Sequence, residues 1–197
     1  MKPISRASKP PPPLRPLPQS RRFLAALKRL PILDGGPIAL QFLPGLTSSR
    51  GKLLSSAGHG KEVHAASFLR TRRITLESAL LKAEAELTRI LLHELFHFIW
   101  LRLGNRKRRQ WEALLLAEFR RKARGDAGWS AEHVKLLIEQ PGQSKLWRLY
   151  VCESFCDSGA VYAGRLTAHP EFTLAATFWA KRTEWLGIIL GAERISI

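Results

Sequence analysis

The residues with the clearest chemical potential lie in one short run, His93-Glu94-Leu95-Phe96-His97. The two histidines are four positions apart, and side chains at that spacing lie on one face of a helix, so both imidazoles can reach one metal ion. Glu94 lies one position round the helix from His93, from where its carboxylate reaches a metal-bound water instead of the metal. We therefore expect His93 and His97 to bind zinc and Glu94 to activate that water.

The apolar pattern around this run predicts a long helix over residues 78–103, ended by Gly104-Asn105. On that helix, Ile90, His93, His97 and Trp100 or Leu101 form one stripe, which places the histidines toward the interior. The pattern is short, so the alternative interpretation is a pair of core histidines whose nitrogens are satisfied by carboxylates.

A second informative run, Tyr150 to Ala160, contains Glu153 and Asp157 four positions apart. Together, the two runs resemble the gluzincin class of zinc metallopeptidases, in which an H-E-x-x-H helix is followed by an E-x-x-x-D helix. The resemblance implies that Glu153 is the third zinc ligand and that Asp157 supports a ligand histidine from behind. It also implies a zincin-like α+β fold, mainly helical, with a small N-terminal sheet and an active-site helix that bears the histidines.

The physical chemistry of the second run agrees with that resemblance. Glu153 and Asp157 share one face of an otherwise apolar helix, where two bare carboxylates are costly to bury. A metal ion and an imidazole N–H would compensate both charges. The alternative interpretation is a pair of carboxylates on the helix surface.

Other side chains offer different ligands. His133 is expected at the start of a helix in a solvated or capping role, and His169 is expected at the surface in a turn. Cys152 and Cys156 could bind metal as thiolates, but they lie about a quarter-turn from the two carboxylates. We interpret them as small buried core residues.

The predicted reaction is zinc-dependent hydrolysis, most readily of a peptide bond in a peptide or protein substrate. Zinc lowers the pKa of its bound water, Glu94 takes the proton, and the same carboxyl delivers it to the leaving amine. A strand expected at residues 67–76, if it lies at a sheet edge beside the helix, would pair with an extended substrate. Its arginines would then favour acidic side chains. Tyr150 and Tyr162 would either donate to a developing oxyanion or pack in the core.

The charge of the chain is uneven. The 197 residues carry 32 Lys and Arg against 16 Asp and Glu, a formal charge of +16, and residues 1–33 hold eight basic side chains and no acidic one. Because residues 1–20 are also Pro-rich, we expect a disordered tail over 1–33, interrupted by a short helix at 21–30, and one metallopeptidase domain over 34–197. Such a tail attracts an anionic partner. The leading alternative function is therefore a basic nucleic-acid-binding or regulatory module with a peptidase-like zinc domain that is not catalytic.

The rest of the chain sets the remaining expectations. Two cysteines exclude a disulfide scaffold and suit a reducing compartment, so we expect a cytoplasmic location, with an N-terminal targeting segment as the alternative. No apolar stretch reaches the roughly 18–20 residues that span a bilayer. The expected elements are a strand at 38–43, a loop at 47–61, and further helices at 108–123, from Ser130 to Pro141-Gly142, at 145–163 and at 171–190.

Overall fold

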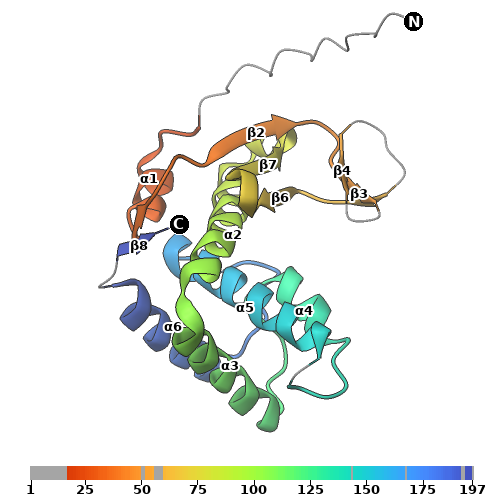
Figure 1. The fold of residues 1–197 in the computed structure, drawn as a ribbon, viewed down its shortest axis with the longest axis vertical. Coiled ribbons are helices and arrows are strands. Elements are labelled where there is room, and N and C mark those ends of the chain that lie inside the picture. Colours follow the sequence, from red (N-terminus) through yellow and green to blue (C-terminus); the bar gives the residue numbers. More distant parts are fainter. Residues whose placement is uncertain are drawn as a thin grey trace, which may run out of the picture.

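The structure is a computed structural model that describes residues 17–49, 52–55, 60–142, 144–166, 168–191 and 194–196. It has the predicted α+β class, with helices dominant and most strands in the N-terminal part of the chain (Figure 1). The helices are α1 (Arg21–Leu27), α2 (Glu84–Arg102), α3 (Gly104–Arg120), α4 (Trp129–Lys135), α5 (Lys145–Gly164) and α6 (Ala176–Leu190). The strands are β1 (Ile32–Asp34), β2 (Ala39–Leu43), β3 (Thr47–Ser49), β4 (Lys52–Leu54), β5 (Lys61–Glu62), β6 (Ala65–Phe68), β7 (Arg73–Glu77) and β8 (Arg194–Ser196).

The sheet nearest the histidine-bearing helix has the strand order β2-β7-β6. β2 runs parallel to β7, and β6 pairs with β7 in the antiparallel sense. The residues Ile74, Thr75 and Leu76 of β7 are buried, as expected for a central strand rich in β-branched side chains. The strand predicted at 38–43 is confirmed as β2.

The single strand predicted at 67–76 is wrong, because two strands occupy this region. β6 and β7 are joined by a 3-10 turn over Leu69–Thr71 and by Arg72, whose φ of 49° places it in the left-handed region. The basic residues lie in this turn or at the first position of β7, and they therefore do not force β7 to a sheet edge. β7 is central and β6 forms the edge, so the expected edge position of the basic strand is also wrong.

The loop predicted at 47–61 contains short strands where it is described. β3 pairs with β4 and with β5 in a small antiparallel sheet. These strands are too short and too polar to show the apolar alternation from which strands are predicted. Residues 50–51 and 56–59 of this predicted loop lie outside the described residues.

The helix starts differ most from prediction. α2 begins at Glu84, because residues 78–82 form a 3-10 helix before it. α4 begins at Trp129 with Gly128 as its N-cap and without a side-chain cap, so the expected cap by Ser130 is wrong. α6 begins at Ala176 and not at residue 171, because the backbone of Thr173 and the residue after it bonds to Asp126 instead of entering the helix.

α2 and α5 pack side by side near the middle of the ribbon in Figure 1. Phe96 of α2 and Phe155 of α5 are fully buried between them, with ring centroids 5.5 Å apart. Gly159 permits this close approach, since a Cβ there would lie 2.2 Å from a ring carbon of Phe96. The contact sets the histidines of α2 opposite the carboxylates of α5.

The short helix predicted at 21–30 is present as α1 and packs into the same core. Phe23 and Ala26 are buried there, and the Ser20 hydroxyl donates to Glu84 at 2.6 Å while it caps α1. Packed structure therefore includes residues that the predicted boundary at residue 34 assigned to the tail. Residues 1–16, which hold the Pro-rich run, lie outside the described residues.

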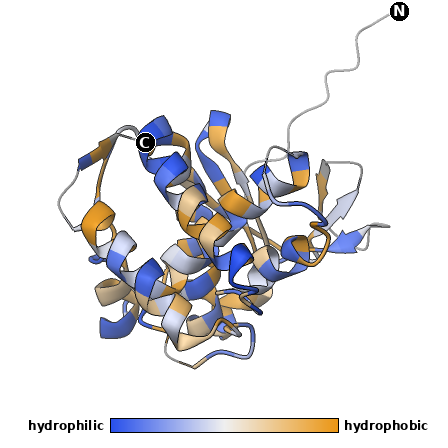
Figure 2. Ribbon diagram, turned by 90° about the horizontal axis from the view of Figure 1, so that it is seen from below, coloured by the Kyte–Doolittle hydropathy of each residue, from blue (hydrophilic) through white to orange (hydrophobic). Residues whose placement is uncertain are grey.

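A buried polar network ties α3, α5 and α6 together. Arg182 of α6 is fully buried and donates to Glu118 and Asp126 at 2.6 Å, and to Ser158 at 3.0 Å. Both carboxylates neutralise a guanidinium that would otherwise be costly to bury. Figure 2 shows that the helices carry both hydrophilic and hydrophobic residues. None of the described helices is long and apolar enough to cross a membrane.

Candidate metal centre

His93 and His97 lie on one face of α2, as predicted from their spacing. Their ring centroids are 4.9 Å apart, and ligand atoms of His93, Glu94 and His97 all lie within 4.8 Å of one another. The side chains of both histidines are only partly exposed, at 11% and 19%. The three residues thus form a half-buried group that could hold a metal ion.

The Glu153 carboxylate on α5 faces both imidazoles. Its Oε2 lies 3.4 Å from His93 Nε2, and its Oε1 lies 4.0 Å from His97 Nε2. In a tetrahedral zinc site with bonds of about 2.0–2.2 Å, neighbouring nitrogen and oxygen donors are separated by about 3.4 Å. The separation between His93 and Glu153 therefore fits a shared zinc ion, and the separation to His97 exceeds it by about 0.6 Å.

Asp157 holds the other side of His93. Its Oδ1 lies 2.7 Å from His93 Nδ1, and its Oδ2 accepts from the backbone N–H of Ala131 at 2.9 Å. Gly128 gives the carboxylate its space, because a Cβ at that position would lie 2.4 Å from the Asp157 carboxyl carbon. The start of α4 therefore holds the Asp157 carboxylate in place, independently of its contact with the imidazole.

This arrangement fixes the tautomer of the neutral imidazole. An ionised carboxylate can only accept, so Nδ1 of His93 carries a hydrogen that it donates to Asp157. The lone pair of Nε2 then faces the Glu153 carboxylate at 3.4 Å. Two acceptors at that distance repel each other unless a proton or a metal cation lies between them.

Without a metal, protons take that role. Burial lowers the pKa of His93, but the Asp157 and Glu153 carboxylates outweigh it and hold the pKa well above its usual value. Burial raises the pKa of Glu153, and the opposing effect of His93 and His97 leaves it below its usual value. The site thus attracts positive charge at the point where the donor atoms converge.

Glu94 is buried beside the two histidines and is held by a strand residue. The Ser67 hydroxyl on β6 lies 2.5 Å from Glu94 Oε2 and 3.1 Å from its backbone oxygen. Ser67 was not predicted as a site residue, because it lies 27 positions earlier on another element. Only the packing of β6 against α2 brings it to the site.

A cavity of about 570 Å³ opens beside His93 and Glu94. β5, the start of β6 and the loop that joins them line the cavity together with α2 and the start of α4. The Lys61 ammonium of β5 lies 4.6 Å from the ring centroid of Trp129 at the start of α4. The cavity thus gives a molecule access to the carboxylate of Glu94.

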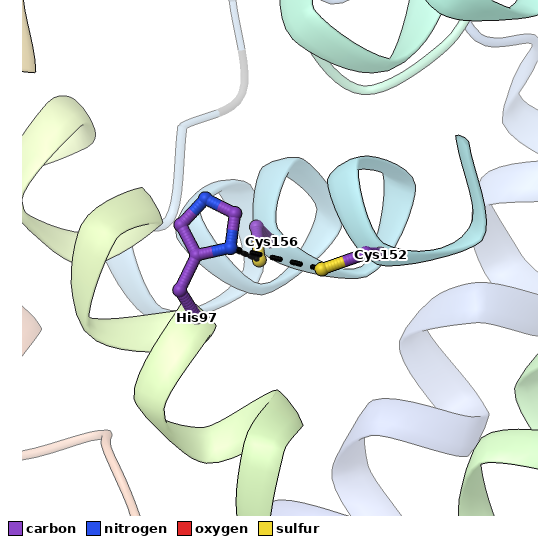
Figure 3. Close-up of side chains that lie close together, drawn as sticks. All are labelled: His97, Cys152 and Cys156. Carbon is purple, nitrogen blue, oxygen red and sulfur yellow. Dashed lines mark hydrogen bonds between the residues drawn. The ribbon is translucent and has the colours of Figure 1, made fainter. Parts of the chain in front are cut away.

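The Nδ1 atom of His97 faces two thiols on α5 (Figure 3). Cys156 Sγ lies 3.3 Å and Cys152 Sγ 3.7 Å from it. The pKa of Cys152 is lowered to about 6, mainly by a hydrogen bond from Cys156. Burial raises this pKa, and the nearby His97 lowers it further. Cys156 is fully buried, as predicted, whereas Cys152 is only partly buried, and the contact of the thiols with a site histidine was not predicted.

The remaining predicted candidates lie elsewhere. His133 is exposed and stacks on Trp129, and His169 bonds to Glu86 at 2.7 Å. The Tyr150 hydroxyl is buried and donates to Asp126 at 2.8 Å, and Tyr162 lines a different cavity. Neither tyrosine is therefore placed to donate to a substrate at His93.

No family model, no curated protein and no solved structure matches this chain.

Proposed function

We propose that this protein is a zinc-dependent hydrolase of the gluzincin type, acting on peptide bonds. His93, His97 and Glu153 would hold the zinc ion, and Glu94 would act as the general base. The observation that carries the proposal is the Glu153 carboxylate facing Nε2 of both histidines, while Asp157 occupies the far nitrogen of His93. Asp157 already satisfies Nδ1 of His93, and the further carboxylate of Glu153 faces Nε2 of both histidines, where a metal ion would balance its charge.

A bound zinc ion supplies a Lewis acid that polarises a carbonyl oxygen and lowers the pKa of water toward neutrality. The protein residues supply orientation and proton transfer. Asp157 keeps the His93 ring in one tautomer, as outer partners of ligand histidines commonly do. Glu153 brings a negative charge that lowers the cost of burying a divalent cation between the helices.

Glu94 would take a proton from the attacking water and deliver it to the leaving nitrogen as the C–N bond breaks. The Ser67 hydroxyl donates to Oε2 and so restrains the carboxylate of Glu94, which lines the cavity. Ser67 would therefore be a positioning residue that acts through Glu94. General acid–base catalysis of this kind typically contributes about 10²–10⁴-fold.

The edge strand β6 supports an extended peptide as the substrate. This strand forms one edge of the sheet β2-β7-β6, lies beside α2 and lines the cavity at Ala65. Peptides commonly add to such an edge by backbone hydrogen bonds. Because β6 carries no arginine, the predicted preference for acidic side chains is not retained.

The activity test uses zinc-loaded protein and a fluorogenic peptide library. Glu94→Gln should keep its zinc and lose about 10²–10⁴-fold in cleavage rate. Glu184→Gln, on the exposed side of α6, is the matched control and should cleave like the wild type. Cleavage by Glu94→Gln at the wild-type rate, or no cleavage by the zinc-loaded wild type, would contradict the proposal.

The predicted cytoplasmic location and anionic partner of residues 1–33 stay predictions.

A further inference from the structure

His97 presents its two ring nitrogens to two different sets of donors. Nε2 faces the Glu153 carboxylate, and Nδ1 faces the thiols of Cys152 and Cys156. The three atoms of the second set, one nitrogen and two sulfurs, lie within 4.8 Å of one another. The proposed hydrolase uses only the first set, so the thiols have no role in it.

The separations in the second set are those of metal ligands. With zinc–sulfur bonds of about 2.3 Å and zinc–nitrogen bonds of about 2.0–2.1 Å, tetrahedral geometry places nitrogen and sulfur about 3.6 Å apart. The observed separations from His97 Nδ1 are 3.3 Å to Cys156 and 3.7 Å to Cys152, and they bracket that value. An ion could therefore enter this group with small side-chain adjustments.

The chemistry of the donors selects the ion. Two thiolates and one imidazole form a soft set that also accepts zinc, and it favours more thiophilic cations such as Cd²⁺ more strongly than the harder imidazole and carboxylate set does. Cys156 is fully buried and Cys152 is partly buried, so bulky thiol reagents are excluded more strongly than a bare ion. Both thiols lose their protons to solvent as the sulfur–metal bonds form.

We infer that Cys152, Cys156 and Nδ1 of His97 form a second metal site that prefers a thiophilic cation. The site belongs to α5 and to the last turns of α2 and needs no other element (Figure 3). Its existence does not depend on the proposed hydrolase activity.

One consequence does rest on the proposed function. A neutral imidazole has one lone pair, so a cation on Nδ1 of His97 leaves the ring hydrogen on Nε2. That hydrogen would point toward Glu153 and remove His97 from the zinc ligands. Thiophilic ions would therefore displace zinc and inhibit hydrolysis, which couples the two sites through one side chain.

The test is a titration of the full-length protein with Cd²⁺, followed by the sulfur-to-cadmium charge-transfer absorption. The wild type should reach saturation at one equivalent, and ¹¹³Cd NMR of the same sample should report sulfur ligands without any substitution. Cys152→Ser and Cys156→Ala should each weaken Cd²⁺ binding more than about 100-fold, beyond the 10–100-fold typical of outer partners of a ligand. His93→Ala should bind Cd²⁺ at the thiols as the wild type does.

The outcomes separate this site from the zinc site. If His93→Ala loses zinc but keeps the cadmium–thiolate absorption band, both sites are supported. If the wild type binds no zinc yet shows the cadmium–thiolate band, only the hydrolase proposal fails. Absence of the band and of sulfur ligands in the wild type would overturn the second site. A band that appears only as two chains associate would also overturn it, because the thiols would then act between molecules.

Discussion

Replacement of Asp157 by asparagine removes one charge and keeps the shape of the side chain. Asp157 accepts from His93 Nδ1 at 2.7 Å with one oxygen and from the Ala131 N–H at 2.9 Å with the other. An asparagine has only one oxygen for these two donors. Its NH₂ group must therefore face one of them, and a donor then opposes a donor in a buried place.

The cost follows from which donor is left without an acceptor. If the amide oxygen stays with Ala131, the His93 ring must move its hydrogen to Nε2 and lose the lone pair that the metal needs. If the oxygen stays with His93, a buried N–H is unsatisfied, at a cost of about 1–3 kcal/mol in folding free energy. Outer partners of ligand histidines contribute about 10–100-fold to metal affinity, so we expect Asp157→Asn to weaken zinc binding by about 1.4–2.8 kcal/mol.

The assay is competition for zinc with a chromophoric chelator, with circular dichroism to confirm folding. The other two aspartates of the chain are matched controls. Asp34→Asn alters an exposed pair with Arg194 and should change nothing. Asp126→Asn breaks the buried pair with Arg182 and should lower the free energy of unfolding by about 3–5 kcal/mol, with the zinc affinity of the folded protein unchanged. Zinc affinity of folded Asp157→Asn within threefold of the wild type would refute the role given to Asp157.

Three further outcomes are expected. The raised pKa of His93 keeps this histidine protonated in the metal-free protein, so zinc must displace a proton when it binds. The zinc affinity should therefore rise with pH until the pH passes this raised pKa. Calorimetry in buffers of different ionisation enthalpy would detect the released proton, and no proton release at pH 7 would contradict this expectation. Gly159→Ala should lower the free energy of unfolding by about 1–3 kcal/mol because its Cβ would meet the Phe96 ring, whereas Gly187→Ala, whose nearest neighbour lies at 3.4 Å, should raise it by up to about 1 kcal/mol in chemical denaturation. Ser67→Ala should keep full zinc content and reduce kcat about 10–100-fold, since a hydrogen bond to a charged group contributes about 1.5–3 kcal/mol; an unchanged kcat would remove Ser67 from the site.

The helical part of the candidate site was predictable because a helix converts spacing into direction. Residues four apart share a face, so the spacing alone placed His93 beside His97 and Glu153 beside Asp157. That the two pairs face each other was implied only by the resemblance of the two motifs. The structure brings them together through the contact of Phe96 with Gly159, which no local pattern encodes.

The remaining site residues depend on tertiary packing. Ser67 reaches Glu94 because β6 lies along α2, and the prediction of one strand across 67–76 hid the turn that creates β6. The thiols were expected about a quarter-turn from the carboxylates, and their contact with the second nitrogen of His97 was not predicted. Which nitrogen of a histidine meets which neighbour is set by side-chain rotation and cannot be inferred from spacing.

The sheets were the least predictable part of the fold. β8 pairs with β1 across almost the whole chain, and β3 to β5 are too short for a periodic signal. Charge also misled the prediction, because the arginines at 70, 72 and 73 suggested an edge strand. They lie in or beside the turn, and the strand that follows is buried at the centre of its sheet.

The zinc content of purified, dialysed protein tests the central claim most directly. Wild type and Glu94→Gln should each hold about one zinc per chain, because Glu94 is proposed as a base and not as a ligand. His97→Ala and Glu153→Ala should lose it, because each removes one of the three proposed protein ligands. Full zinc retention by folded Glu153→Ala would contradict the proposed site.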